Sequence, residues 1–161
     1  MDVYVALGSN QGDSMAILTE AMDKLQTLAR FPIGRSSLWK TEPIDCPPGS
    51  PPFLNAVVRL TLDSSHAPES LLGVFQRWER EAGRKAKTQL NEARPLDLDL
   101  IAVDMLQVQS PQLVVPHPRA HQRYFVLAPL AELAPELVLP GQSKTVAVLL
   151  QEQEPLGTRL A

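Results

Sequence analysis

A run of alternating residues at positions 93–101, ARPLDLDLI, constrains the fold more than any other part of the sequence. Successive side chains on a β-strand point to opposite faces of the sheet. Asp97 and Asp99 therefore share one face, and the leucines at positions 96, 98 and 100 share the other. The run predicts a strand that buries an apolar face and leaves an acidic face open.

The two carboxylates of this strand are candidate metal ligands. Side chains two positions apart on a strand are separated by roughly 6.6 Å. This spacing lets Asp97 and Asp99 converge on one magnesium ion or on a pair, with substrate phosphates completing the coordination. A bound cation also removes the repulsion between the two anions. The alternative is a strand whose acidic face is simply hydrated.

The composition narrows the class of protein. With 161 residues, we expect a single domain over 1–161, with a peripheral tail beyond about 145. A net charge of -3 offers no basic excess for nucleic acid, and no apolar run is long enough for a membrane span. The N-terminus has no signal-peptide pattern, and Cys46 is the only cysteine. We expect a cytoplasmic monomer that binds neither nucleic acid nor membrane.

The predicted elements occur in a recognisable order. They are a strand at 3–7, a helix at 15–28, strands at 35–40 and 53–62, a helix at 68–82 and the Asp/Leu strand. This order is the split βαβ pattern of a ferredoxin-like α+β fold, βαββαβ. We expect an antiparallel sheet with both helices on one face. The other face is left for a ligand, or is covered by loops and C-terminal elaborations.

The segments around this core are less regular. Residues 41–52 contain five prolines, which excludes a helix or a central strand and predicts an ordered loop. After the Asp/Leu strand we expect an extended stretch at 111–119, a helix at 120–133 broken at Pro129, and a short strand at 136–140. The tail beyond residue 143 is predicted to be one short helix followed by disorder.

Two aromatic residues and one amide are candidates for binding a flat heterocycle. Phe53 and Phe125 both lie beside polar loop residues, and two rings can sandwich such a ligand. Asn55, on the same strand face as Phe53, offers a donor and an acceptor to the edge of the ring. The alternatives are ordinary core residues and a satisfied polar side chain at the sheet edge.

Basic residues flank the acidic strand in the sequence. Residues 84–94 carry Arg84, two lysines and Arg94, which suits a phosphate clamp or a solvated loop. His117, between two prolines, can bond a phosphate or a ribose, or cap a turn. Arg119 and Arg123 add positive charge nearby. Neither a Walker phosphate-binding loop nor a serine hydrolase elbow is present in the sequence.

Taken together, the motifs resemble those of the 6-hydroxymethyl-7,8-dihydropterin pyrophosphokinase family of folate biosynthesis. They are VALGSN with GD at 5–13, TEP at 41–43, FLNAVV at 53–58, Glu79 with Gly83 and Arg84, RPLDLDL at 94–100, VPHPR at 115–119, and Arg123 with FVL and PL at 125–130. The resemblance covers roughly residues 3–140. The ordered set is specific, although no single motif would be.

The resemblance implies a reaction and a set of residues. The β,γ-diphosphoryl group of ATP moves to the hydroxymethyl oxygen of the pterin, and AMP leaves. Two magnesium ions held by Asp97 and Asp99 are implied, with Arg84 and Arg94 as further catalytic residues. The implied pterin residues are Thr41, Pro43, Ile44, Phe53, Asn55 and Phe125. The implied ATP contacts are Glu79, Arg84, Arg94, His117 and Arg123.

One loop departs from the family pattern. Between Arg84 and Arg94 the family usually carries a further arginine and then Arg-Trp-Gly. Here Ala86, Leu90 and Asn91 replace two arginines and the tryptophan. The lysines at 85 and 87 supply charge but not a bidentate clamp. The departure keeps open two alternatives, a divergent paralogue acting on another pterin and a non-catalytic nucleotide- or pterin-binding module.

Overall fold

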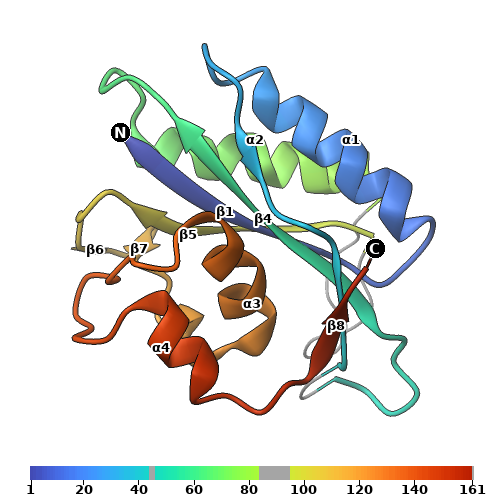
Figure 1. The fold of residues 1–161 in the computed structure, drawn as a ribbon. Coiled ribbons are helices and arrows are strands. Elements are labelled where there is room, and N and C mark those ends of the chain that lie inside the picture. Colours follow the sequence, from blue (N-terminus) through green and yellow to red (C-terminus); the bar gives the residue numbers. More distant parts are fainter. Residues whose placement is uncertain (44–45, 84–94, 161) are drawn as a thin grey trace.

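One antiparallel sheet runs through the molecule (Figure 1). The computed structural model describes residues 1–43, 46–83 and 95–160. The strand order is β5-β1-β4-β3-β8, and β2 also pairs with β4. The strands of this sheet are β1 (Asp2–Ser9), β2 (Gly34–Arg35), β3 (Trp39–Thr41), β4 (Phe53–Thr61), β5 (Asp97–Val103) and β8 (Gly157–Arg159).

The central strand β1 is buried on both faces. It pairs with β4 on one side and with β5 on the other, antiparallel in each case. Val3, Val5 and Leu7 enter the core on one face, and Tyr4 and Ala6 enter a second core on the other. The β-prone sequence VYVAL therefore forms a strand that two separate hydrophobic cores share.

Helices cover both faces of the sheet (Figure 1). The helices α1 (Ser14–Gln26) and α2 (Pro68–Glu81) lie on one face, where their apolar side chains pack against β1, β4 and β5. The helices α3 (Tyr124–Leu133) and α4 (Val146–Gln151) cover part of the other face. Among the described residues, no helix is long and apolar enough to cross a membrane.

The predicted α+β fold is confirmed. The order strand, helix, strand, strand, helix, strand is present, and both helices of this core lie on one face. The predicted faces of β5 are also confirmed, since Leu96, Leu98 and Leu100 enter the core between the sheet and α1 and α2. Asp97 and Asp99 are on the opposite face and are only partly buried.

The strand predicted at 35–40 is in fact two short strands. Ser36 interrupts the ladder: its hydroxyl accepts a hydrogen bond from the backbone N–H of Val57 at 2.8 Å. The next residue, Ser37, is directed toward α3, and its hydroxyl donates a hydrogen bond to the carboxylate of Glu132 at 2.7 Å. The Ser36 backbone N–H still donates to the Val57 carbonyl at 3.0 Å, but the serine hydroxyl replaces the backbone acceptor for Val57, which separates β2 from β3 along β4.

The predictions for the C-terminal third were wrong in three places. The helix at 120–133 begins as a single 3₁₀ turn, η1 (Ala120–Gln122), and α3 then continues through Pro129 without a break. Proline removes only one helical hydrogen bond there, and its buried ring packs in the core. Residues 136–140 form no strand. The tail is ordered as far as residue 160, since β8 pairs with β3 in the main sheet.

A small hairpin was not predicted. The strands β6 (Val108–Gln109) and β7 (Val114–Val115) pair with each other outside the main sheet. They bring the extended segment 111–119 back toward β5, where the N–H of His117 donates to the carbonyl of Ile101 at 2.8 Å. The hairpin therefore places His117 beside the acidic strand.

Candidate active site

A cavity of about 760 Å³ lies at one end of the sheet. Its walls come from β1, β3, β4, β5, α2, α3 and the segment that leads into α3. The volume is within the range of sites that bind small molecules. It is the place where most of the predicted site residues meet.

The strand register brings the acidic pair and Asn55 into one wall of the cavity. Gly8 of β1 pairs with Asp97 on one side and with Asn55 on the other. Asp99 pairs with Ala6 in the neighbouring row. Asp97 and Asn55 are thus two strand spacings apart, roughly 10 Å between backbones. A ligand in the cavity can touch a carboxylate at one end and the amide at the other.

Gly8 permits this arrangement because it has no side chain. A Cβ atom at position 8 would lie 3.1 Å from Nδ2 of Asn55 and 3.7 Å from Cδ1 of Phe53. The first of these separations is tighter than ordinary van der Waals contact. The glycine therefore leaves room for the two side chains that line the cavity beside it.

Asn55 is held in place by Thr41. Both side chains are buried, and the Thr41 hydroxyl donates to Oδ1 of Asn55 at 2.5 Å. This hydrogen bond fixes the carboxamide, with its nitrogen on the side of Gly8. A buried amide with a defined orientation can read the donor and acceptor pattern of a ligand edge.

Phe53 and Phe125 reach the cavity from different elements, β4 and α3. The guanidinium of Arg123 lies over the Phe125 ring, 5.3 Å from its centroid, which is a cation–π distance. Arg123 also lines the cavity, so one end of α3 contributes an aromatic face and a positive charge.

The acidic side of the cavity is anchored to α2 through Glu79. Its carboxylate accepts a hydrogen bond at 2.8 Å from the backbone N–H of Leu98, which lies between Asp97 and Asp99. Glu79 is buried, and it lines the cavity. This bond ties β5 to α2 where the acidic pair projects into the cavity.

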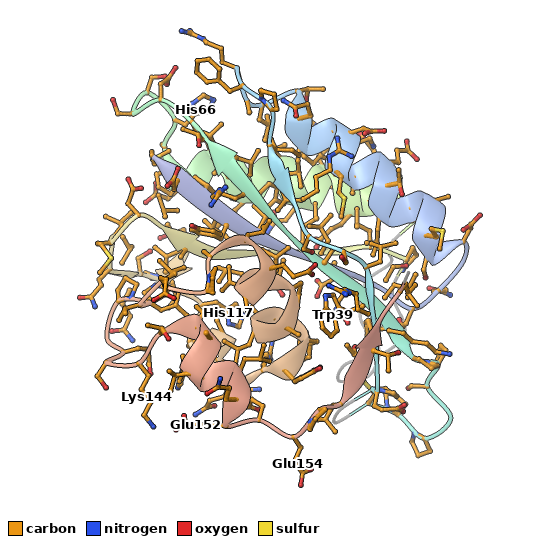
Figure 2. The ribbon with its side chains drawn as sticks, viewed as in Figure 1. Trp39, His66, His117, Lys144, Glu152 and Glu154 are labelled. Atoms are coloured by element: carbon orange, nitrogen blue, oxygen red, sulfur yellow. The ribbon has the colours of Figure 1, made fainter. Side chains whose placement is uncertain are left out.

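His117 is a neutral hydrogen-bond donor at pH 7. Burial lowers the pKa of His117 to about 4, Arg123 and Arg119 act in the same direction, and Asp97 opposes them. The ring Nδ1 accepts a hydrogen bond from the backbone N–H of Arg119 at 3.2 Å. The single proton of the neutral ring is therefore on Nε2. Figure 2 shows His117 beside α3.

The carboxylates suit a magnesium ion shared with phosphates. Within residues 1–43, 46–83 and 95–160, no group of three or more His, Cys, Asp or Glu side chains could hold a metal. Mg²⁺ is commonly held by one or two carboxylates and completes its octahedron with water and substrate phosphate oxygens. Asp97 and Asp99 fit that ligand set.

The cavity collects nine of the predicted site residues. They are Thr41, Phe53, Asn55, Glu79, Asp97, Asp99, His117, Arg123 and Phe125. Pro43 does not line the cavity. Ile44, Arg84 and Arg94 lie outside the residues that the structure describes. Glu42, Cys46, Gln76, Gln112 and Gln122 also line the cavity and were not predicted. Isolated residues of these types carry no signal in a sequence, because glutamate and glutamine are common on any protein surface and a lone cysteine is usually an ordinary buried residue.

A profile of the 7,8-dihydro-6-hydroxymethylpterin-pyrophosphokinase family matches residues 4–135. The chain belongs to this family. The resemblance predicted from the sequence is thus confirmed, and with it the assignment to the pyrophosphokinase enzymes.

Two relatives in this family are similar over most of their length. A Porphyromonas gingivalis 2-amino-4-hydroxy-6-hydroxymethyldihydropteridine pyrophosphokinase is 41% identical over 140 residues, which covers 84% of this chain and 92% of that protein. A Bacillus subtilis protein of the same name is 36% identical over 135 residues, which covers 83% of this chain and 78% of that protein.

A solved structure has the same fold. It is a Plasmodium falciparum HPPK-DHPS triple mutant with pteroate, with a TM-score of 0.70 at 14% identity. The match covers 94% of this chain and 43% of that one, so the chain spans less than half of the longer protein. At this identity the likeness establishes the fold alone.

Proposed function

We propose that this chain transfers the β,γ-diphosphoryl group of ATP to the hydroxymethyl oxygen of 6-hydroxymethyl-7,8-dihydropterin, releasing AMP, in folate biosynthesis. The observation that carries the proposal is the register across Gly8. In a chain of this family, it places the Asp97 carboxylate and the Asn55 amide in one cavity.

The pterin binds at the Asn55 end of the cavity in this proposal. The Thr41–Asn55 hydrogen bond supports an oriented amide for the ring edge, and Phe53 and Phe125 line the same space. Aromatic side chains stack on a flat heterocycle. Pro43 and Ile44, which follow Thr41 in the sequence, complete the proposed pterin residues.

The phosphates of ATP bind at the Asp97 end. Asp97 and Asp99 would hold the two magnesium ions, which when bound neutralise phosphate charge and lower the pKa of the attacking hydroxyl. The Nε2–H of His117 and the guanidinium of Arg123 are positioned to bind phosphate oxygens. Glu79, Arg84 and Arg94 are the further residues proposed on this side.

The residues act by positioning and by charge. Phosphoryl transfer requires an in-line arrangement and neutralised oxygens more than covalent chemistry by the protein. Holding the pterin at Asn55 orients its hydroxymethyl oxygen toward the phosphate chain. Arginines at the other end stabilise charge as it develops on the leaving AMP.

The physical form of the enzyme is part of the proposal. We propose one domain over residues 1–161 that acts as a monomer in the cytoplasm. The main sheet, with cores on both faces, supports one domain, and the single cysteine of the sequence, Cys46, supports a reducing compartment.

The decisive experiment measures AMP release from ATP and magnesium, with and without 6-hydroxymethyl-7,8-dihydropterin. We expect AMP only when the pterin is present. Tight calorimetric binding of both ligands without AMP would favour the non-catalytic module. AMP formation with another pterin alone would favour the divergent paralogue and would direct attention to residues 85–93.

A further inference from the structure

We propose that the C-terminal strand β8 positions the pterin side of the cavity. In this proposal Gly157 sets the place of Thr41, and Thr41 sets the orientation of Asn55. The inference rests on the proposed function, because it assumes that Asn55 reads a pterin. It concerns a strand beyond residues 4–135, the part that the family profile matches.

Strand β8 lies along the outer edge of β3. Thr41 is opposite Gly157 on this side and opposite Phe53 of β4 on the other. The N–H of Glu42 donates to the carbonyl of Leu156 at 3.0 Å, which extends the pairing past Thr41. A cavity residue is thus held between two strands, one of which is the last element of the described chain.

The contact at Gly157 is too close for any side chain. A Cβ atom at position 157 would lie 2.6 Å from the carbonyl oxygen of Lys40, 2.8 Å from Cγ2 of Thr41 and 3.2 Å from Cα of Thr41. Two of these three atoms belong to the backbone of β3. A residue larger than glycine therefore requires one of the two strands to move.

A shift of Thr41 would directly change the position of the Asn55 amide, because the two side chains are hydrogen-bonded. The Thr41 hydroxyl donates to Oδ1 of Asn55 at 2.5 Å, and both side chains are buried. Hydrogen bonds between such groups weaken steeply as distance and angle depart from the optimum. The path from Gly157 to Asn55 therefore consists of one steric contact and one hydrogen bond.

Strand β8 is also fixed from the side of α3. The Tyr124 hydroxyl donates to the carbonyl of Gly157 at 3.5 Å, and Arg159 lies 4.0 Å from the carboxylate of Glu132. Trp39 of β3 lies between these elements, with its ring edge-on to Tyr124 and its indole N–H donating to Glu132 at 2.8 Å (Figure 2). Since α3 carries Phe125, β8 is linked to both sides of the proposed pterin site.

The test compares two glycine-to-alanine variants of the full chain. Gly157→Ala introduces the close contact, whereas Gly73→Ala in α2 places its Cβ where no atom lies within 4 Å. Dissociation constants for the pterin and for Mg-ATP are measured separately by calorimetry, together with the thermal midpoint. We expect Gly157→Ala to weaken pterin binding about tenfold, equal to about 1.4 kcal/mol, and to leave Mg-ATP binding within about twofold. Gly73→Ala leaves both constants unchanged.

A double-mutant cycle separates positioning from general damage. Thr41→Val removes the hydroxyl that holds Asn55. If Gly157→Ala acts through that hydroxyl, the double variant binds the pterin no more weakly than Thr41→Val alone. Independent damage would instead make the two losses add.

Equal losses of pterin and ATP affinity, unchanged pterin affinity, or the loss of cooperative folding in Gly157→Ala would each overturn the proposal. A wild-type chain that binds no pterin overturns the proposed function and this inference with it. Wild-type binding that Gly157→Ala leaves unchanged overturns the inference alone.

Discussion

At the scale of single residues, the chemistry of the cavity depends on which groups are charged. Asp97 and Asp99 are half-buried, and Arg123 lies over the Phe125 ring. His117 is influenced by both charges but stays neutral, because burial, with Arg123 acting in the same direction, outweighs the attraction of Asp97. The cavity therefore offers separate places for cations and for phosphate oxygens.

Replacing Asp97 by asparagine tests the carboxylate. We expect Asp97→Asn to lower turnover at least about a hundredfold, since a carboxylate proposed to hold the magnesium ions that neutralise phosphate charge is lost. The thermal midpoint should change little, because Asp97 is not in the core. The control is Asp23→Asn, an exposed aspartate of α1 with 66% of its side chain accessible. Near-normal magnesium-dependent turnover in Asp97→Asn would contradict the metal assignment.

Removing the ring of Phe53 tests stacking. Phe53→Ala should weaken pterin binding by about 1–3 kcal/mol, the usual worth of a buried aromatic contact. Phe31→Ala is the matched control, because that ring is 63% exposed and lies outside the cavity lining. Calorimetric titration with the pterin measures both. An unchanged pterin affinity in Phe53→Ala would show that Phe53 is an ordinary core residue and does not stack on the pterin.

The lowered pKa of His117 predicts a pH dependence of stability. Below pH 6.5 the unfolded chain takes up a proton at this ring, whereas the folded chain does so only near pH 4. The free energy of unfolding should therefore fall as the pH drops from 6.5 to 4. We expect this residue to contribute about 1–2 kcal/mol, discounted for partial exposure of the ring. Urea unfolding at pH 7 and pH 4.5 measures it, and His117→Gln, which does not titrate, should lose correspondingly less.

At the scale of elements, one carboxylate of α3 makes several of its bonds to the outer strands and the link between them. Glu132 accepts hydrogen bonds from the Ser37 hydroxyl at 2.7 Å and from the Trp39 indole at 2.8 Å. The side chain of Glu132 is 23% exposed. These bonds hold β3 against the helix that carries Phe125, so they support one wall of the cavity from behind.

Removing the carboxylate of Glu132 should weaken the contact between α3 and β3. We expect Glu132→Ala to lower the free energy of unfolding by about 1–3 kcal/mol, because the donors from Ser37 and Trp39 lose their acceptor. Glu132→Gln keeps one oxygen acceptor and should lose about half as much. Urea unfolding followed by tryptophan fluorescence, which arises from Trp39 and Trp78, measures the loss. A loss that is equal in Glu132→Gln and Glu132→Ala would show that these hydrogen bonds are not the cause.

At the scale of the whole molecule, the sheet separates two hydrophobic cores and the cavity opens at its end. The α1 and α2 side is closed by large buried side chains such as Phe75 and Leu25. The α3 and α4 side covers Tyr4 and Val57 but ends before Asp97 and Asn55. A ligand at this end contacts both layers, so binding should stabilise the molecule as a unit.

Mg-ATP and the pterin should therefore each raise the thermal midpoint of the protein, and their effects should add. At a free concentration one hundred times its dissociation constant, each ligand adds about 2.7 kcal/mol. We expect Mg-ATP with the pterin to raise the midpoint by more than either one does alone, and EDTA to abolish the contribution of ATP. Differential scanning fluorimetry measures both effects. A nucleotide-dependent shift that persists in EDTA would argue against magnesium at Asp97 and Asp99.

The local pattern of the sequence determined much of this protein. The alternation at 93–101 established both faces of β5, and helical periodicity located α1 and α2. The motifs identified the family and nine of the residues that line the cavity. These properties follow from neighbours in the chain, because side-chain periodicity and turn residues act over a few positions.

Only the tertiary structure decided which distant segments meet. The pairing of β8 with β3 joins residues more than a hundred positions apart, and nothing within residues 157–159 signals it. The continuation of α3 through Pro129 depends on the core that buries the proline, and the neutrality of His117 depends on burial and on Arg123. Burial, charge environment and strand partners belong to the whole fold, so no short stretch of sequence contains them.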